Sequence, residues 1–322
     1  MEVDHLRELV SEDFDAVNAL IIETIQSPIE IIENVATHAI QSGGKRLRPL
    51  LVLLASHACA YKGNNHIKLA AMMEIFHNAT LLHDDVIDES SLRHGKKTTN
   101  KIWGNKISIL VGDYLFTKYL ELMLEIGDID IITLLIKMAP QMGYGEIQEF
   151  TNRHNINLTI SEYFNIIRAK TSLLFASAAS VGALIAKANT PIQKALYTFG
   201  LHAGNAFQLI DDALDYCSKV ETFGKNIGGD LADGKLTMPL LHALKCGTAA
   251  QQTKIKESLE RYNPECLNEI LEILAQTKAI EYTRSIARTE IDLALSALQI
   301  LPGSPYKLAL EKFAYYVIHR TY

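Results

Sequence analysis

The strongest constraint on the fold is a helical spacing of apolar residues that runs through most of the 322-residue chain. Apolar residues recur at intervals of three and four, and few segments alternate apolar and polar residues as half-buried strands do. Glycine, asparagine and proline interrupt the pattern where helices are expected to end. The expected helices span residues 50–60, 67–90, 107–126, 129–150, 161–187, 192–217, 235–246 and 266–298. The sequence therefore predicts an all-α fold.

Composition and length narrow the class of protein further. Apolar residues make up 48% and charged residues 21%, which is ordinary for a globular protein and excludes disordered, collagen-like and disulfide-scaffold chains. With 31 Lys and Arg against 37 Asp and Glu, the net charge of −6 gives no reason to expect a nucleic-acid partner. The length allows one domain or two. Because neither an internal repeat nor a Pro- or Ser-rich linker divides the chain, we predict one helical domain over residues 1–322.

The cysteines, the N-terminal residues and the longest uncharged segment indicate the cellular location of the protein. The four cysteines form no CxxC pair, which argues against a zinc site or a disulfide framework and is typical of a reducing compartment. The first residues are acidic, where a signal peptide carries positive charge. Residues 171–186 lack charge, but they are short for a membrane span and rich in Ser, Ala and Gly, so we predict a tightly packed buried helix. A cytoplasmic protein without a transmembrane segment is expected.

Two aspartate clusters with the same spacing are the main functional signal. The pattern Asp-Asp-x-x-Asp occurs at residues 84–88 and again at 211–215, in both cases among Leu, Ile, Val and Phe. Helical geometry places the first and last aspartate of each cluster one turn apart on one face, where like charges repel. A divalent cation bound by oxygen ligands would relieve this repulsion. Mg²⁺ favours a few carboxylates together with substrate phosphates, so the two clusters predict a diphosphate bridged by Mg²⁺.

Cationic residues that can bind phosphate accompany these clusters. The segment of residues 43–49, GGKRLRP, is expected to turn into a helix from Leu50, which places Lys45 and Arg48 near a helix N-terminus that favours anions. Neither a Walker loop nor GxGxxG is present. The remaining candidates for phosphate recognition are Arg93, Lys96, Lys97, Lys170 with Thr171, Lys225 and Lys235.

These segments, taken together and in order, resemble the trans-type isoprenyl diphosphate synthases (polyprenyl synthetases). The resemblance rests on GGKRLRP, LLHDDVIDES, Lys170-Thr171, FQLIDDALDY and GKNIGGDLADGK, and it covers nearly the whole chain. Within the family, EIFHNATLLHDD and GNKISILVGDYLFT are most similar to bacterial members that make an octaprenyl product for the ubiquinone side chain. The resemblance implies long helices around a central cavity, and usually a homodimer.

The resemblance also assigns roles to individual residues. About three Mg²⁺ ions are implied on the allylic diphosphate. Their implied ligands are Asp84, Asp88, Asp211 and Asp215, with Asp85 and Asp212 beside them as further catalytic residues. The residues implied to bind the allylic diphosphate or to assist its departure are Arg93, Lys170, Thr171, Gln208, Lys225 and Lys235. Of these, Lys170 and Lys225 are also catalytic candidates. The isopentenyl diphosphate site is assigned to Lys45, Arg48 and His77. His94 stands where the family usually has a second Arg, which puts the strength of isopentenyl diphosphate binding in doubt.

The expected reaction ionises the allylic diphosphate, condenses the cation with isopentenyl diphosphate and then loses a proton, without a side-chain base. Ala79 and Thr80 lie about one turn before the first cluster. A growing chain would pass along this face, and an enzyme with a short product would be expected to carry an aromatic residue here. Their small side chains predict an open tunnel and a long product, with Met123 and Leu135 as candidates for its floor.

Three other functions remain open from the sequence. A terpene cyclase would share the aspartates and an apolar cavity, but it needs no second diphosphate site of the kind predicted at Lys45 and Arg48. A shorter-product synthase, making geranylgeranyl or farnesyl diphosphate, is disfavoured by Ala79 and Thr80. A regulatory subunit of a heteromeric synthase typically lacks one aspartate cluster, whereas this chain has both. Farnesyl diphosphate is the expected primer.

Overall fold

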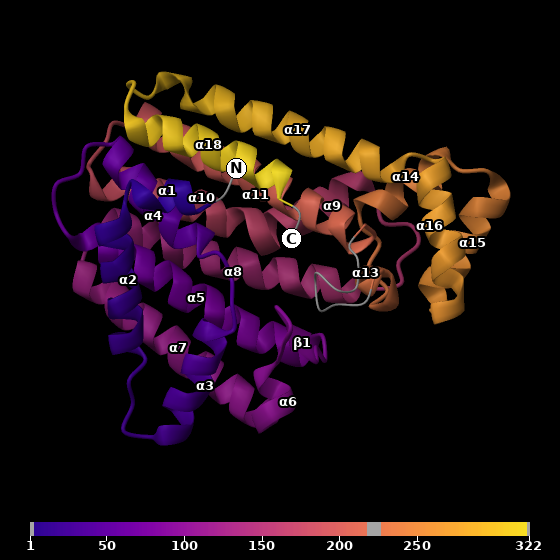
Figure 1. Cartoon of the computed structure of the whole chain (residues 1–322), viewed down its shortest axis with the longest axis horizontal. Coiled ribbons are helices and arrows are strands. Elements are labelled where there is room, and N and C mark those ends of the chain that lie inside the picture. The colour runs from indigo at the N-terminus through magenta and orange to yellow at the C-terminus, as the bar shows by residue number, and fades with distance from the viewer. Residues whose placement is uncertain (1–2, 218–226, 321–322) are drawn as a thin grey trace. The chain divides into compact units, whose positions relative to one another are not determined.

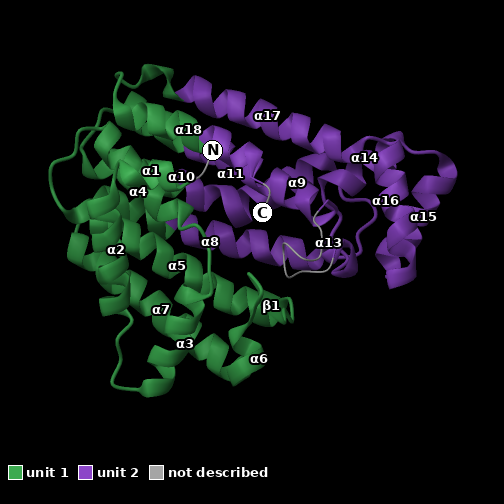
Figure 2. Cartoon of the chain, in the orientation of Figure 1, with its two compact units in different colours: residues 1–136, 177–197, 298–313 green, residues 137–176, 198–297, 314–322 purple. Residues whose placement is uncertain are grey.

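The computed structural model describes residues 3–217 and 227–320, and most of them are helical (Figure 1). These residues form two compact units, which Figure 2 shows in different colours. Unit 1 contains residues 1–136, 177–197 and 298–313, and unit 2 contains residues 137–176, 198–297 and 314–322. The expectation of an all-α fold is confirmed. The expectation of a single domain stays a prediction.

Unit 1 contains most of the N-terminal half. Its elements are α1 (Asp4–Glu8), α2 (Ser11–Thr24), α3 (Glu30–Gln41), α4 (Leu47–Ala58), α5 (Asn65–Ile87), β1 (Leu92–Arg93), β2 (Lys96–Lys97), α6 (Thr99–Trp103), α7 (Asn105–Ile126) and the 3₁₀ turn η3 (Leu298–Ile300). Helix α5 packs against α2, α4 and α7, and its first three turns are almost entirely buried. The two short strands pair antiparallel, with Leu92 opposite Lys97 and Arg93 opposite Lys96.

Several long helices contribute residues to both units. They are α8 (Ile129–Thr151), α10 (Leu173–Ile185), α11 (Thr190–Asp215) and α18 (Pro305–His319). The predicted tightly packed helix at 171–186 is confirmed in α10, where Ala, Ser and Gly side chains are buried. A Cβ placed on Gly182 would lie 2.7 Å from the Ala55 Cβ, so only glycine permits this approach of α10 to α4. No helix among the described residues is long and apolar enough to cross a membrane.

Unit 2 contains most of the C-terminal half. Its further elements are α9 (Ile160–Ile167), the π-helical turn η1 (Arg168–Ser172), α13 (Gly229–Ala232), α14 (Met238–Cys246), α15 (Ala249–Glu260), the 3₁₀ turn η2 (Pro264–Cys266), α16 (Leu267–Gln276) and α17 (Ala279–Ala297). Thr159 begins α9 with a capping box, in which its hydroxyl accepts the Glu162 N–H and the Glu162 carboxylate accepts the Thr159 N–H. Helix α14 packs mainly on α17.

The structure corrects several expected helix bounds. Helix α4 begins at Leu47 rather than Leu50, so Pro49 is its third residue, where a missing N–H costs no intrahelical bond. The expected helix at 161–187 is divided by the π-helical turn, and that at 266–298 is divided into α16 and α17. Helices α1, α2, α3, α6, α13, α15 and α18 were not expected.

Candidate active site

The first aspartate cluster lies at the C-terminal end of α5. Asp85 is 4% exposed, while Asp84 and Asp88 are partly exposed. The expectation that all three lie within the helix is wrong for Asp88, which is the C-cap: its N–H donates to the Asp84 carbonyl at 2.8 Å, and α5 ends at Ile87. The last carboxylate of the cluster therefore lies in the last turn, beside carbonyls that carry partial negative charge. A cation is the natural partner for such a site.

Asp85 has a different environment from its two neighbours. The Arg93 Nε and Nη2 both donate to Asp85 Oδ1, at 3.0 and 2.8 Å. Arg93 comes from β1, so the hairpin after the cluster returns a guanidinium to it. The Asn100 side chain donates to the Asp85 carbonyl at 2.8 Å. Asp85 is thus an internally paired carboxylate, buried against the guanidinium of Arg93.

The cationic loop before α4 is held by the first two helices. Arg7 of α1 donates to the Lys45 carbonyl at 2.6 Å, and the Arg46 guanidinium donates to Asn18 Oδ1 of α2. These contacts support Arg46 in a left-handed conformation with φ of 44°, which is costly for a residue with a Cβ. The loop consequently places Lys45 just before the helix and Arg48 in its first turn.

Four of the residues assigned to diphosphate binding lie together in unit 1. Burial lowers the pKa of His77 well below its ordinary value, and the positive charges of Arg48, Arg93 and His94 lower it further. Gly43 lies against His94: a Cβ on this glycine would be 3.1 Å from the His94 Cβ, and its φ of 122° also requires glycine. The loop and the hairpin therefore meet beside a neutral His77 and form a cationic group of the kind that diphosphate binding requires.

Two of the candidate lysines do not join this group. The Lys96 ammonium donates to the Gln41 carbonyl at 2.8 Å on the surface. The Lys97 side chain is exposed, and its carbonyl accepts a hydrogen bond from His38 at 2.8 Å. Proximity in sequence to the first aspartate cluster therefore did not predict the positions of these two side chains, because both strand residues are exposed to solvent.

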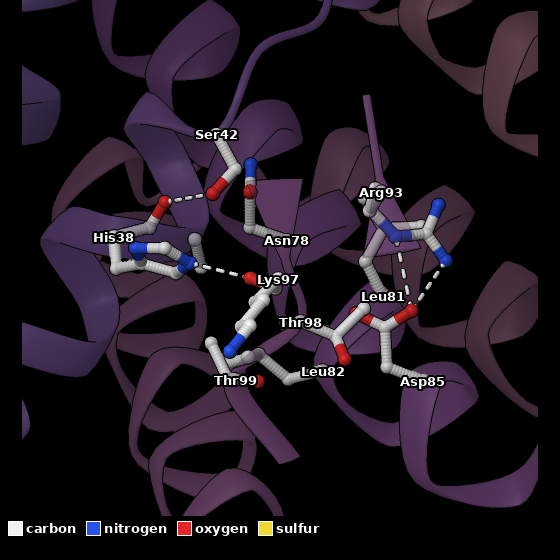
Figure 3. Close-up of a pocket in the computed structure, with 11 residues that line it drawn as sticks. His38, Ser42, Asn78, Leu81, Leu82, Asp85, Arg93, Lys97, Thr98 and Thr99 are labelled. Atoms are coloured by element: carbon white, nitrogen blue, oxygen red, sulfur yellow. Dashed lines mark hydrogen bonds and ion pairs between the residues drawn. The ribbon is translucent and has the colours of Figure 1, made fainter. Parts of the chain in front are cut away.

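A small cavity lies beside the Asp85–Arg93 pair (Figure 3). Its volume is about 20 Å³, room for one water molecule, which excludes a substrate. Its lining residues are His38, Ala39, Ser42, Asn78, Leu81, Leu82, Asp85, Arg93, Lys97, Thr98 and Thr99. Figure 3 shows the Arg93 guanidinium directed at the Asp85 carboxylate from the neighbouring hairpin. The cavity therefore borders this ion pair and is not a substrate site.

The second aspartate cluster ends α11 in unit 2, and its middle residue is bound by neutral groups. Asp212 is 2% exposed. The Tyr163 hydroxyl of α9 donates to Asp212 Oδ2 at 2.5 Å, and Gln208 Nε2 donates to Oδ1 at 2.9 Å. The Thr171 hydroxyl in turn donates to Gln208 Oε1 at 2.9 Å. Thr171 and Gln208, both predicted site residues, are therefore joined to the cluster by one hydrogen-bond chain.

The other two aspartates of this cluster have polar partners of different kinds. Asp215 Oδ1 and Oδ2 accept the backbone N–H groups of Gly229 and Asp230, at 3.2 and 3.1 Å. Asp211 accepts a hydrogen bond from Arg320 Nη2, and this guanidinium also stacks over the Phe207 ring at 3.7 Å. Arg320 follows α18, so a residue 109 positions away supplies the cation at Asp211.

The charge balance of this region favours a bound cation. Burial, together with the charges of Asp211 and Asp215, raises the pKa of Asp212 to about 7, against the lowering effect of the Tyr163 and Gln208 hydrogen bonds. Burial also raises the pKa of Asp230 well above its ordinary value, with Asp215 and Asp212 adding to the effect. Several carboxylate oxygens gathered where ionisation is unfavourable fit a hard divalent cation such as Mg²⁺.

Two candidate lysines of unit 2, Lys170 and Lys235, are held by glutamates of α8. Lys170 Nζ lies 2.9 Å from Glu146 and 2.8 Å from Glu149, and Lys235 Nζ lies 3.4 Å from Glu149. Lys170 belongs to the π-helical turn, an irregularity that is frequent at functional sites. A Cβ on Gly145 would lie 2.8 Å from the Lys170 N, so glycine lets α8 approach this turn. Lys225 lies outside the described residues.

Sequence reasoning missed four residues around the second cluster. Tyr163, Glu146 and Arg320 are separated from their partners along the chain, and no local pattern singles them out. Asp230 lies within GKNIGGDLADGK, so the motif itself contained a signal. Glu149 was given no role from the sequence, and the structure places it between Lys170 and Lys235.

The residues assigned to product length lie in unit 1. Ala79 is 2% exposed, and Met123 and Leu135 are also buried. The Thr80 hydroxyl donates to the His77 carbonyl at 2.8 Å, which leaves its methyl group as the larger free surface. One turn further from the aspartates, Phe76 packs on Tyr119 of α7 with ring centroids 4.7 Å apart, and Phe116 lies 5.8 Å from Tyr119. Small residues thus occupy the positions next to the aspartates, and the first aromatic residue on this part of α5 is Phe76, one turn beyond Ala79.

Comparison with known proteins identifies the family. A profile of the polyprenyl synthetase family matches residues 29–277. The chain belongs to the polyprenyl synthetase family, and it is a prenyltransferase. It is 38% identical over 321 residues to octaprenyl diphosphate synthase of Escherichia coli (strain K12), covering 99% of each chain. It is also 38% identical over 314 residues to an all-trans-nonaprenyl-diphosphate synthase (geranyl-diphosphate specific) of Rhodobacter capsulatus, covering 96% of each.

Solved structures agree with this family assignment. The crystal structure of a polyprenyl synthase from Caulobacter crescentus CB15, complexed with calcium and isoprenyl diphosphate, matches with a TM-score of 0.96 and 37% identity, covering 100% of this chain and 98% of that chain. A decaprenyl diphosphate synthase from Rhodobacter capsulatus matches with a TM-score of 0.94 and 38% identity, covering 100% of both. The fold is the all-α isoprenoid synthase fold, and the chain is a long-chain trans-polyprenyl diphosphate synthase.

Proposed function

We propose that this protein condenses isopentenyl diphosphate repeatedly with an allylic diphosphate, in a Mg²⁺-dependent reaction that yields an octaprenyl product for the ubiquinone side chain. The observation that carries the proposal is the pair of aspartate clusters, each accompanied by its own phosphate-binding cations. The similarity to octaprenyl diphosphate synthases over full length supports the product class. Farnesyl diphosphate is the proposed primer.

In unit 1, the proposed isopentenyl diphosphate site is made by Lys45, Arg48, His77 and His94. Arg48 and Lys45 would neutralise the diphosphate, while a neutral His77 donates a hydrogen bond without adding charge. His94 has a shorter and only partly charged side chain near neutral pH in place of the usual Arg. The loss of a bidentate contact should raise the KM for isopentenyl diphosphate without stopping the reaction.

The proposed allylic site uses both clusters. Asp84, Asp88, Asp211 and Asp215 would hold Mg²⁺, which neutralises the diphosphate as it leaves. Arg93 and Lys235, with Lys170 and Lys225, would stabilise the negative charge that develops on this leaving group. Thr171 and Gln208 orient Asp212 through their hydrogen-bond chain. The allylic cation is then attacked by the double bond of isopentenyl diphosphate, and the departing diphosphate takes the proton.

Product length is proposed to depend on the face of α5 below the first cluster. Ala79 and Thr80 would leave the path open, and Phe76 with Tyr119 is a further candidate for its floor beside Met123 and Leu135. Ala79→Tyr should shorten the main product by several isoprene units, because the phenol ring would obstruct this face. Phe76→Ala should lengthen it. Chromatographic resolution of the products by chain length measures both shifts, and an unchanged distribution in both variants would contradict this tunnel path.

A homodimer is proposed on the exposed apolar surface of unit 1. Leu110 and Leu124 of α7 are 62% and 74% exposed, and Ile129 and Ile136 of α8 are 70% and 50% exposed. Apolar patches of this kind mark protein interfaces. Leu124→Glu should therefore shift the protein toward monomer in light scattering.

We further propose that the two units act as one catalytic domain, and that the protein is cytoplasmic, as its four free cysteines suggest.

The direct test is incubation of the purified chain with radiolabelled isopentenyl diphosphate, farnesyl diphosphate and Mg²⁺. Elongation to a ladder ending near eight isoprene units would support the proposal. A ladder that ends at a shorter or longer chain would change only the proposed product length and leave the proposed reaction unchanged. Cyclised hydrocarbon products would indicate a terpene cyclase, and no elongation with any allylic primer would contradict the proposal for this chain acting alone.

A further inference from the structure

Three side chains with metal-binding atoms meet in unit 1, away from the aspartate cluster of that unit. They are Asp13 of α2, His57 at the C-terminal end of α4 and His66 in the first turn of α5. One oxygen of Asp13 and one ring nitrogen of each histidine all lie within 4.8 Å of one another. Along α5, His66 is about 27 Å from Asp84, because each residue adds ~1.5 Å. The group therefore belongs to neither proposed diphosphate site.

The contacts within this group place both imidazoles on one oxygen. Asp13 Oδ2 lies 2.6 Å from His57 Nε2 and 3.0 Å from His66 Nε2. Both rings are also held from the side: His57 stacks on Tyr306 with centroids 4.8 Å apart, and His66 meets the Tyr61 ring edge-on at 5.5 Å. Two nitrogens and one oxygen thus converge with fixed orientations, from three helices.

The chemistry of the donor set selects the class of ion. Two imidazole nitrogens and one carboxylate oxygen suit Zn²⁺ and related transition metals, whereas Mg²⁺ and Ca²⁺ favour oxygen ligands alone. Burial raises the pKa of Asp13, but the hydrogen bonds and charges of His57 and His66 outweigh this and hold it below its ordinary value. Metal binding requires an ionised carboxylate and neutral imidazoles, and these three side chains can supply both.

We propose that Asp13, His57 and His66 bind one transition-metal dication of the zinc class, with water as the fourth ligand. Tetrahedral ligands at zinc bond lengths lie about 3.3 Å apart. The contacts at 2.6 and 3.0 Å would therefore have to open by about 0.7 and about 0.3 Å, which small rotations of the side chains can supply. The Asp13 and His57 side chains are 25% and 23% exposed, which leaves a route for the ion and its water.

The site differs from a closed structural zinc site in one respect. The His66 side chain is 5% exposed, and its Nδ1 has no hydrogen-bond partner among the described residues. When Nε2 binds the metal, the ring proton moves to Nδ1, and a ligand histidine normally donates this proton to an acceptor. Because this acceptor is missing, the site should have a lower metal affinity than a closed structural zinc site. Chelators should therefore remove the bound ion readily.

Metal binding would tie α2 to the hairpin of α4 and α5. The same helix α2 carries Asn18, which accepts the Arg46 hydrogen bond beside Lys45. The metal would therefore stabilise the N-terminal helices that support the cationic loop, without touching substrate. This role is independent of the proposed condensation reaction, and the two can fail separately.

The test uses the full-length protein, stripped of metal and kept in excess Mg²⁺ so that the aspartate clusters are occupied. Co²⁺ is titrated as the probe, followed by Zn²⁺. We expect one equivalent of Co²⁺ to produce the strong visible absorption of a tetrahedral site, and Zn²⁺ to abolish it and raise the melting temperature. The octahedral oxygen sites of the aspartates give only weak absorption, so the two classes of site are distinguished.

Three variants assign the signal. His57→Gln and Asp13→Asn should each weaken Co²⁺ binding at least tenfold, since each removes or neutralises one ligand. His5→Gln is the matched control, because His5 pairs with Glu8 on the surface of the same unit without a third ligand. Unchanged Co²⁺ affinity in both ligand variants, or no tetrahedral signal in the unmodified protein, would overturn the proposal and leave a hydrogen-bonded triad.

Discussion

The two aspartate clusters have the same spacing but different surroundings. At the first, the buried middle residue Asp85 is paired with the Arg93 guanidinium, which the following hairpin returns to it. At the second, the buried middle residue Asp212 is bound by Tyr163 and Gln208, which are neutral. Within the part of the chain that the structure describes, the first cluster therefore carries a counter-charge for its middle carboxylate, whereas the hydrogen-bond partners of Asp212 are neutral.

This difference has an electrostatic consequence. A buried carboxylate without a cation favours its protonated form, and burial raises the pKa of Asp212 to about 7. The cation in the second cluster is Arg320, which lies on Asp211 rather than on Asp212. We infer that the second cluster depends more on a bound metal for its charge balance, and that Arg320 occupies part of the place a metal would take.

The largest expected effect is a loss of turnover, and it tests whether the two aspartate clusters contribute equally to catalysis. Asp84→Ala and Asp211→Ala should each lower kcat on the order of 1,000-fold, because each removes a metal ligand that acts on the leaving group. His94→Ala should change kcat/KM by less than about tenfold, since it affects one contact to isopentenyl diphosphate. Steady-state rates at saturating Mg²⁺ measure these changes. Near-normal turnover of Asp84→Ala would refute the catalytic assignment.

The next largest effect concerns the free energy of unfolding of the metal-free protein when the middle residue of either cluster is replaced. Asp85→Asn leaves the Arg93 charge uncompensated and should lower the free energy of unfolding by ~2 kcal/mol. Asp212→Asn removes a buried charge that has no cationic partner, so at pH 8 it should be neutral or stabilising by up to ~1 kcal/mol. Urea unfolding of both variants measures the difference. Equal destabilisation would show that the environments do not differ in the way proposed.

The pH dependence of stability follows from Asp212. Its pKa of about 7 exceeds the ordinary value of 3.8, so the folded state holds a proton that the unfolded state has lost between these pH values. The metal-free protein should therefore lose stability as pH rises from about 4 to 7, by at most ~1.4 kcal/mol per pH unit from this group. Mg²⁺ should reduce the slope by favouring the ionised form. Asp212→Asn should also reduce the slope of stability against pH. An unchanged slope in that variant would mean that a group other than Asp212 causes the pH dependence.

The smallest expected effect is that of Arg320. Arg320→Gln removes the guanidinium that competes for Asp211, so the apparent affinity for Mg²⁺ should rise about threefold to tenfold. The concentration of Mg²⁺ at half-maximal activity measures this change. Arg320→Lys keeps the charge and serves as the matched control. Weaker Mg²⁺ binding in Arg320→Gln would mean that Arg320 positions Asp211 instead of competing at it.

Local features of the sequence were sufficient for some elements but not for others. Helices such as α5, α7 and α11 follow from their strong apolar spacing. Helix α15 was missed although it has a capping box between Thr248 and Gln251, a signal that is local and can be read from sequence. The β1–β2 hairpin has only two residues in each strand, too short for a periodic pattern.

By itself the sequence determined that the chain is helical and that it carries two carboxylate clusters accompanied by cationic residues, because periodicity and spacing are properties of neighbouring residues. Only the tertiary structure decided which aspartate of each cluster is buried and what faces it. Arg93 lies 8 residues from Asp85, but Tyr163 lies 49 residues from Asp212 and Arg320 lies 109 residues from Asp211. The pKa of a carboxylate depends on burial and on charges within a few ångströms, and packing brings those groups together irrespective of their separation along the chain.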